Sequence, residues 1–174
     1  MKPEEAIKTA IEFEQKVHRT YHDAVAAAKD STARRFFELM ATEERSHIDY
    51  LEHKLARWTS DGVLDADDLE TALPSPARLA QGLAKLKEGW GRSAKSATPG
   101  TELAALKQAL EAEGATLAFY RRMVEELPGE YRKLFARFLD IEEGHRAAVA
   151  AEIDAVESFG FWFDMQEFDQ ELGV

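Results

Sequence analysis

The feature that most constrains the fold of this 174-residue chain is a metal-ligand motif that occurs twice. In each copy a glutamate stands three residues before a histidine. A separate glutamate, followed after seven residues by a tyrosine, stands 29 or 30 residues before that pair. The two copies consist of Glu14, Tyr21, Glu44 and His47, and of Glu113, Tyr120, Glu142 and His145. The register is kept, because the first glutamates are 99 residues apart and the second ones 98. We infer a duplicated pair of helices whose halves face each other.

Helix geometry gives these intervals a structural meaning. Three residues advance an α-helix by about 300° and roughly 4.5 Å, so the glutamate and the histidine of each pair leave the same face one turn apart. His47 precedes the apolar residues Ile48 and Leu51, which places this pair within the apolar stripe of its helix. Four glutamates and two histidines are the ligand set of a di-metal site at the centre of a four-helix bundle. The predicted metal ligands are Glu14, Glu44, His47, Glu113, Glu142 and His145.

The charge of this ligand set agrees with two divalent cations. Four carboxylates and two neutral imidazoles total −4, and without a metal such a cluster in a low-dielectric core would raise its pKa values and take up protons. Carboxylate and imidazole donors suit iron or manganese, and ligand type alone does not separate iron, manganese and zinc. We predict two metal ions as the cofactor, and at this point iron, manganese and zinc all stay open.

The two tyrosines repeat in register with the ligands. Seven residues make almost two helical turns, so Tyr21 shares a face with Glu14, and Tyr120 shares a face with Glu113. We predict that each phenol donates a hydrogen bond to a ligand carboxylate of the facing helix and so tunes the metal site. The alternative is an aromatic core residue whose hydroxyl finds some other partner.

The apolar periodicity predicts an all-α fold and a single domain over 1–174. Two helical hairpins would be joined by a long crossover at 60–100 that contains a short helix near 75–87, and a short C-terminal helix would follow at 161–172. A connection of two or three residues makes the first two helices antiparallel neighbours. The four long helices are predicted at 3–29, 32–59, 101–126 and 130–158.

Composition narrows the function classes. The formal net charge of −11 argues against nucleic-acid binding, which needs a basic surface, and against docking on anionic lipid. The absence of cysteine excludes disulfides, thiol nucleophiles and thiolate-bound iron. No apolar segment typical of a signal peptide or a membrane span is visible. We therefore expect a cytoplasmic protein.

Other titratable residues are weaker candidates. His18 and His22 lie four residues apart and could form a surface metal clip, but two solvated histidines are the favoured interpretation. His53 is off the ligand face and is expected to be exposed. Four glutamates adjacent to ligands or close to them in sequence should point roughly 100° or 200° away from the ligand face. They are Glu12, Glu43, Glu111 and Glu143.

The ligand residues, with Tyr21 and Tyr120 in support, resemble the rubrerythrin-like branch of the ferritin-like superfamily over about 3–58 and 101–158. The resemblance implies a ferritin-like four-helix bundle with a carboxylate-bridged di-iron centre, in which Glu44 and Glu142 bridge both metals. Glu14 with His47 would complete one iron and Glu113 with His145 the other, or the pairing would be crossed. It also implies a peroxidase or ferroxidase that reacts with hydrogen peroxide or dioxygen.

The chain departs from rubrerythrins at two points. It has no cysteines for a rubredoxin domain, so an electron donor protein would have to act in trans. Rubrerythrins also often carry an extra glutamate one turn after the ligand on the third helix, and Thr116 stands there in this sequence.

Two other functions stay open. One is iron storage of the bacterioferritin type, although Arg45 stands where bacterioferritin has its haem-ligating methionine and the crossover here is much longer. The other is a non-catalytic metal-binding helical module. The long crossover and the aromatic tail also predict a homodimer, with exchange of helical hairpins between chains as one form of it.

Overall fold

The computed structural model describes residues 1–64, 69–89 and 100–158, and every regular element within them is helical. This confirms the predicted all-α class, and the predicted helix bounds agree with the observed ones to within two residues. The C-terminal helix predicted at 161–172 lies outside the described residues. The helices are α1 (Pro3–Ala27), α2 (Ser31–Asp61), α3 (Pro76–Gly89), α4 (Thr101–Glu126) and α5 (Gly129–Ser158).

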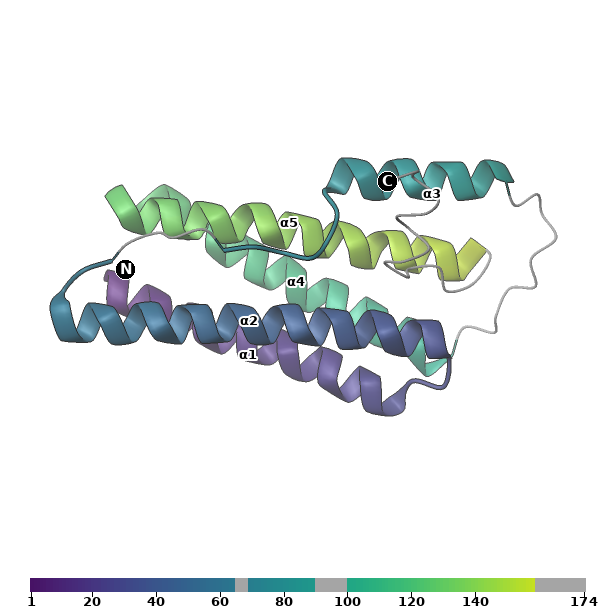
Figure 1. The fold of residues 1–174 in the computed structure, drawn as a ribbon, viewed down its shortest axis with the longest axis horizontal. Helices are drawn as coiled ribbons and strands as arrows, with labels where there is room; N and C mark the ends of the chain where they lie inside the picture. Colours follow the sequence, from purple (N-terminus) through teal and green to yellow (C-terminus); the bar gives the residue numbers. More distant parts are fainter. Residues whose placement is uncertain (65–68, 90–99, 159–174) are drawn as a thin grey trace.

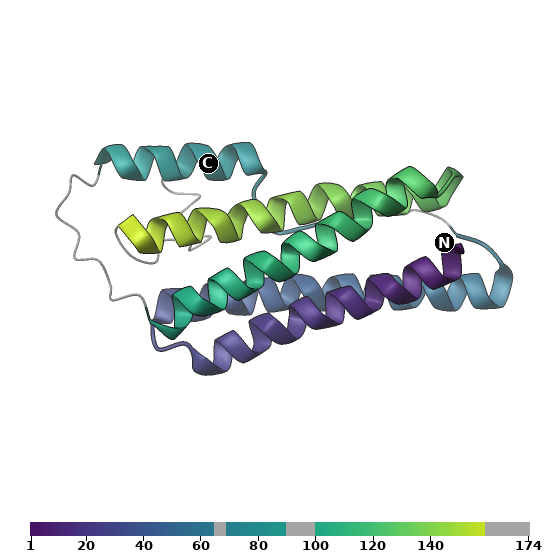
Figure 2. The ribbon, with the colours of Figure 1, turned by 180° about the vertical axis from the view of Figure 1, so that it is seen from behind.

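Four of these helices form a bundle of two antiparallel hairpins (Figure 1). α1 packs against α2, α4 packs against α5, and the hairpins meet where α1 packs on α4. Seen from behind, α1 and α4 run in opposite directions side by side (Figure 2). α2 and α4 point the same way, so the connection between them has to return along the length of the bundle. The predicted long crossover is therefore present.

The turn between α1 and α2 shows how the sequence ends one helix and starts the next. Asp30 accepts hydrogen bonds through Oδ1 from the backbone N–H groups of Thr32 and Ala33, at 2.8 and 2.9 Å. This is the N-cap interaction that stabilises a helix start. Glu102, in the first turn of α4, accepts from the backbone N–H of Lys29 at 2.8 Å. The second hairpin is thus attached to the turn of the first.

The interior consists of two apolar clusters, one toward each end of the bundle. The first includes Phe36, Phe37, Met40, Leu106 and Val149, and the second includes Ile7, Leu51, Phe135 and Phe138. On each long helix the polar buried residues of the predicted site fall between these clusters in sequence. The described helices include none that combines the length and the apolar character needed to cross a bilayer.

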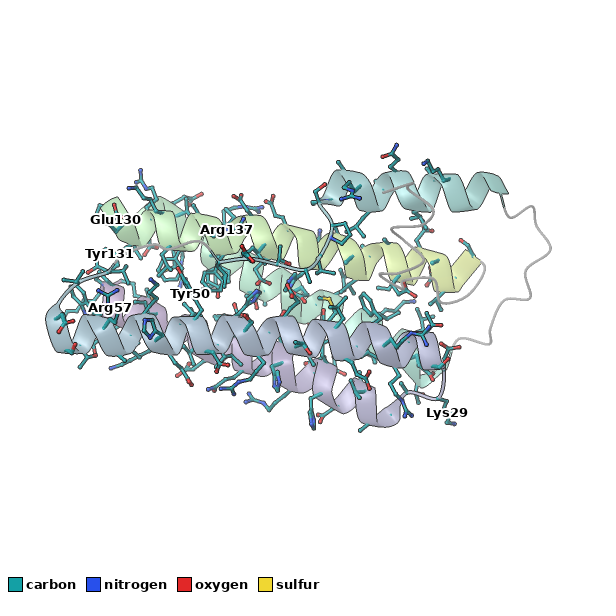
Figure 3. All side chains as sticks on the ribbon, in the orientation of Figure 1. Lys29, Tyr50, Arg57, Glu130, Tyr131 and Arg137 are labelled. Carbon is teal, nitrogen blue, oxygen red and sulfur yellow. The ribbon has the colours of Figure 1, made fainter. Side chains whose placement is uncertain are left out.

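The described part of the crossover lies against α2 and α5. Arg137, labelled in Figure 3, lies on α5. Its Nε donates to the Leu69 carbonyl at 2.8 Å. From the other side, Glu43 of α2 accepts from the Thr71 hydroxyl and the Ala72 backbone N–H. The crossover then enters α3, which packs along α5. One side of the bundle is therefore covered by residues that come from neither hairpin.

Candidate metal centre

All four long helices contribute side chains to one buried polar cluster. Glu14 comes from α1, Glu44 and His47 from α2, Glu113 from α4, and Glu142 and His145 from α5. Each of these six side chains is fully buried, with an exposed fraction of 0%. Buried carboxylates are rare unless they are paired or bind a metal, because burial removes their hydration. Four buried carboxylates and two buried imidazoles in one core therefore make this cluster the candidate site.

Four of the six residues converge at the centre. Glu44, His47, Glu142 and His145 each present one potential ligand atom, and these atoms all lie within 4.8 Å of one another. Nδ1 of His47 lies 3.3 Å from Glu142 Oε1 and 3.8 Å from Glu44 Oε2. Nδ1 of His145 lies 2.8 Å from Glu44 Oε1 and 3.9 Å from Glu142 Oε2. Each of the two glutamates thus faces both histidines.

The two imidazole rings lie side by side. Their centroids are 5.0 Å apart and their planes are inclined by only 13°. The His47 ring also meets Phe138 edge-on at 5.4 Å, and Phe138 stacks on Tyr120 at 5.0 Å. Aromatic side chains therefore close one side of the cluster and keep water away from it.

Glu14 and Glu113 flank the central four and fall outside the group that shares the 4.8 Å limit. Glu14 Oε2 lies 3.2 Å from His47 Nδ1, which agrees with the pairing of Glu14 and His47. Glu113 lies close enough to Glu142 and His145 for both charges to shift its pKa. The six side chains expected from the sequence thus gather in one place, four at its centre and two beside it.

The two tyrosines make crossed hydrogen bonds between α1 and α4. Tyr21 of α1 donates to Glu113 Oε1 of α4 at 2.5 Å, and Tyr120 of α4 donates to Glu14 Oε1 of α1. Hydrogen bonds to carboxylates of the facing helix were predicted, and both are present. Burial and the negative charge of the accepting carboxylate raise the pKa of each phenol well above 10. Both tyrosines therefore stay protonated and act as donors.

Without metal the carboxylates compete for charge. Burial, together with the charges of Glu14 and Glu142, raises the pKa of Glu44 well above its usual value. Burial and the charge of Glu142 do the same to the pKa of Glu113. The pKa of Glu142 is lowered, because the imidazoles of His145 and His47 outweigh the effect of its burial.

The pKa values of the two histidines are raised as well, and for an imidazole a raised pKa favours the charged form. Burial by itself would lower the pKa of His47, but the carboxylates of Glu14 and Glu142 outweigh it and raise that pKa to about 10. The pKa of His145 rises to about 9 for the same reason, with Glu142 and Glu43 as the main partners. In the metal-free protein, protons on these groups offset the carboxylate charge.

The hydrogen-bond deficit of the cluster fits a metal. Within the described residues, six buried side-chain atoms have no hydrogen-bond partner, and every one belongs to the cluster. Native proteins leave few buried polar atoms unpaired, because each costs desolvation free energy. Oxygen and imidazole donors can bind iron, manganese or zinc. Four of the six atoms are carboxylate oxygens that a metal could bind: Glu44 Oε2, Glu113 Oε2, Glu142 Oε1 and Glu142 Oε2. The other two are His47 Nε2 and His145 Nε2, in rings whose Nδ1 atoms face the glutamates.

One residue of the site was assigned wrongly from the sequence. Glu43 was expected to point away from the ligands, but its exposed fraction is only 9% and its Oε2 lies 3.7 Å from His145 Nε2. Its pKa is lowered to about 2, because contacts with His145, Thr71 and Ala72 outweigh burial. The helical wheel of α2 does not show this, since the partners come from α5 and the crossover. A signal was present: the matching residue of the second copy is the apolar Ile141.

The other weak candidates fall outside the central group of four side chains. His22 and His53 are exposed, and His18, half-buried, stacks on His22 with ring centroids 6.1 Å apart. Glu143 is exposed and pairs with Arg121 at 3.3 Å. Glu12 and Glu111 are exposed too. Thr116 is buried and donates its hydroxyl to the Ala112 carbonyl, so its side chain is engaged within α4.

A hollow of about 200 Å³ lies between the crossover and α5. Its lining includes Thr71, Leu73, Arg137, Ile141 and Gly144. Ile141 and Gly144 are the sequence neighbours of Glu142 and His145, so the hollow borders the turn of α5 that carries both ligands. A Cβ built at Gly144 would meet no atom within 4 Å. The glycine therefore leaves space beside the buried cluster.

Comparison of this chain with protein-family models, with curated proteins and with solved structures gave no match.

Proposed function

We propose that this protein is a di-iron oxidoreductase that reacts with hydrogen peroxide or dioxygen, in the manner of rubrerythrin-like peroxidases or ferroxidases. One observation carries the proposal: two glutamates and two histidines from α2 and α5 converge in a fully buried core, with further buried glutamates from α1 and α4 beside them. Two antiparallel hairpins joined by one long crossover support it, because ferritin-like bundles have that connectivity.

The chain offers a separate set of ligands for each of two iron ions. Glu44 and Glu142 face both histidines and are suited to bridge. Glu14 lies beside His47, and Glu113 is influenced by the charge of His145. We assign Glu14 with His47 to one ion and Glu113 with His145 to the other. When bound, the two ions would supply one electron each, which is what reduction of a peroxide O–O bond requires.

The remaining residues hold the ligands and exclude water. Tyr21 and Tyr120 fix the orientation of the flanking carboxylates through hydrogen bonds across the α1–α4 contact. Phe138 packs against His47 and Tyr120 and seals the adjoining side. A protein environment of this kind keeps the site dry and strengthens the electrostatic interactions within it. The hollow beside Gly144 offers room for an oxidant of a few atoms near the centre.

Repeated turnover requires a source of electrons outside this chain. No cysteine is available to build a thiolate-bound iron centre. We therefore include an electron donor protein acting in trans in the proposal.

Stopped-flow absorption of protein loaded anaerobically with Fe²⁺ tests the proposal. We expect two Fe²⁺ per chain, and oxidation to Fe³⁺ on mixing with peroxide or dioxygen that is faster than for free Fe²⁺ in the same buffer. Glu142→Gln should abolish this reaction. Its exposed neighbour provides the matched control, because Glu143→Gln removes a carboxylate from the same helix without touching the cluster. Iron oxidation no faster than in buffer would reject the proposal.

A further inference from the structure

The two histidines of the cluster differ in what lies behind them. Both present Nδ1 to the glutamates, and in both Nε2 is buried without a hydrogen-bond partner. Nε2 of His145 lies 3.7 Å from Glu43 Oε2. The ring of His47 instead packs edge-on against Phe138. The His145 ring therefore has a carboxylate near its Nε2, whereas the His47 ring packs against an aromatic ring.

The two copies of the motif differ in sequence at the position that accounts for this difference. Glu43 directly precedes the ligand Glu44, and the residue that precedes the matching ligand Glu142 is Ile141. Both positions are buried: the exposed fraction is 9% for Glu43 and 2% for Ile141. The ligands themselves are the same in both copies. The copies differ at the position before the first ligand of each pair, where Glu43 faces His145 and the second copy has Ile141.

Glu43 is held in place by the crossover. Thr71 donates from its hydroxyl to Glu43 Oε2 at 2.5 Å, and the Ala72 backbone N–H donates to Oε1 at 3.2 Å. Leu73, the next residue, is buried against the bundle. The carboxylate is thus fixed on one side by the crossover and faces a metal-ligand candidate on the other.

A carboxylate in this position has a known physical effect on a metal-bound histidine. When one ring nitrogen binds the metal, a hydrogen bond from the other N–H to a carboxylate fixes the tautomer, orients the ring and makes the imidazole a stronger donor. The present 3.7 Å separation is longer than a hydrogen bond, and a shift of about 1 Å would close it.

We propose that Glu43 is a positioning residue that accepts the Nε2–H of His145 when His145 binds metal, and that the two metal positions are therefore unequal. The position served by His145 binds its ion more tightly than the one served by His47. This inference rests on the proposed metal-binding function, and it adds an asymmetry that the ligand set itself does not contain.

Titration of the metal-free protein with Co²⁺, followed by calorimetry and visible absorption, tests the asymmetry. We expect two binding steps of unequal affinity. Glu43→Gln should weaken the tighter step by about 10- to 100-fold, the range found when such an outer carboxylate is lost, and bring the two steps together. Thr71→Ala is the matched control: it removes one of the hydrogen bonds that hold Glu43, but the Ala72 backbone N–H still holds the carboxylate beside His145, so the two steps should stay unequal.

Proton NMR of the Co²⁺-loaded protein gives a second readout, the rate at which each histidine ring N–H exchanges with water. A general loosening of the structure would not slow this exchange at one histidine alone. We expect two hyperfine-shifted ring N–H resonances, of which the one from His145 exchanges with water more slowly, and its protection should vanish in Glu43→Gln. If the protein binds two ions with equal affinity and the two ring N–H groups exchange with water at equal rates, the role of Glu43 is overturned, but the proposed metal-binding function is not. A protein that binds no Co²⁺ in the bundle would overturn the proposed function with it.

Discussion

The hydroxyl of Tyr21, on α1, donates a 2.5 Å hydrogen bond to Glu113 on the facing helix α4. Its counterpart Tyr120, on α4, donates to Glu14 on α1. Each of these two helices thus carries one flanking carboxylate and the phenol that orients the other. These two crossed hydrogen bonds couple the hairpins at the buried Glu/His cluster, and they explain why the tyrosines repeat in the sequence at the same interval as the glutamates.

Removing one of these hydroxyls should weaken both the fold and the metal site. In Tyr21→Phe the buried Glu113 loses its donor, which should cost about 1–3 kcal/mol of unfolding free energy in the metal-free protein. Metal affinity should fall by about 10- to 100-fold. Urea denaturation and a metal titration measure the two effects. Tyr131→Phe is the control, because Tyr131 packs on Trp58, away from the ligands. Unchanged metal affinity in Tyr21→Phe would contradict the orienting role.

The metal-free protein should lose stability as the pH rises from about 6.5 to 10. The pKa values of His47 and His145 in the folded state are about 10 and about 9, against 6.5 unperturbed. Their protonation stabilises the fold fully below pH 6.5, and this contribution is lost as the pH passes through 9 and 10. The raised pKa values of Glu44 and Glu113 act in the same direction above pH 4.5.

Thermal melts of chelator-treated protein across that pH range measure the loss. The metal-loaded protein should show a flatter profile, because bound cations replace the protons that offset the carboxylates. A metal-free melting temperature that stays constant or rises between pH 6.5 and 10 would show that the cluster is not protonated as described.

Chelation should lower the melting temperature at neutral pH. A ligand that binds only the folded state adds about 2.7 kcal/mol of stability at a free concentration 100 times its dissociation constant. Differential scanning calorimetry with and without a chelator measures this contribution. In Glu142→Gln the difference between the two melts should shrink toward zero, whereas Glu143→Gln should keep it. An equal chelator effect in both variants would place the metal elsewhere.

Two glycines within helices offer a paired test of the hollow beside the site. A Cβ at Gly114 of α4 or at Gly144 of α5 would meet nothing within 4 Å. Each Gly→Ala change should therefore raise the unfolding free energy by about 0.5–1 kcal/mol through lower backbone entropy in the unfolded chain. Only Gly144 borders the hollow, so only Gly144→Ala should slow oxidation of bound Fe²⁺. Equal oxidation rates in the two variants would exclude the hollow as a route for the oxidant.

The all-α fold and the buried cluster of glutamates and histidines could be predicted from the sequence because both depend on local periodicity. The interval between Glu44 and His47 is one helical turn, so burial of one carries the other into the core. The seven-residue interval to Tyr21 set the phenol on the ligand face of α1, and the duplication supplied the facing helix that provides its acceptor. Helix ends followed from short-range signals such as the Asp30 cap.

The place of Glu43 could not be read in the same way. Its partners Thr71 and Ala72 lie on a segment without helical periodicity, and its approach to His145 depends on how α5 sits against α2. No spacing rule fixes where an irregular connection crosses a bundle. Glu43 and Ile141 occupy matching positions in the two copies. The apolar Ile141 indicates that this position is buried, and therefore that Glu43 is buried too.

X-ray diffraction from crystals of the iron-loaded protein, with anomalous data at the iron edge, tests the central claim most directly. We expect two iron peaks inside the bundle, both in contact with Glu44 and Glu142, with Glu14 and His47 at one and Glu113 and His145 at the other. An interior without an iron peak, or iron bound only at surface histidines such as His18 and His22, would contradict it.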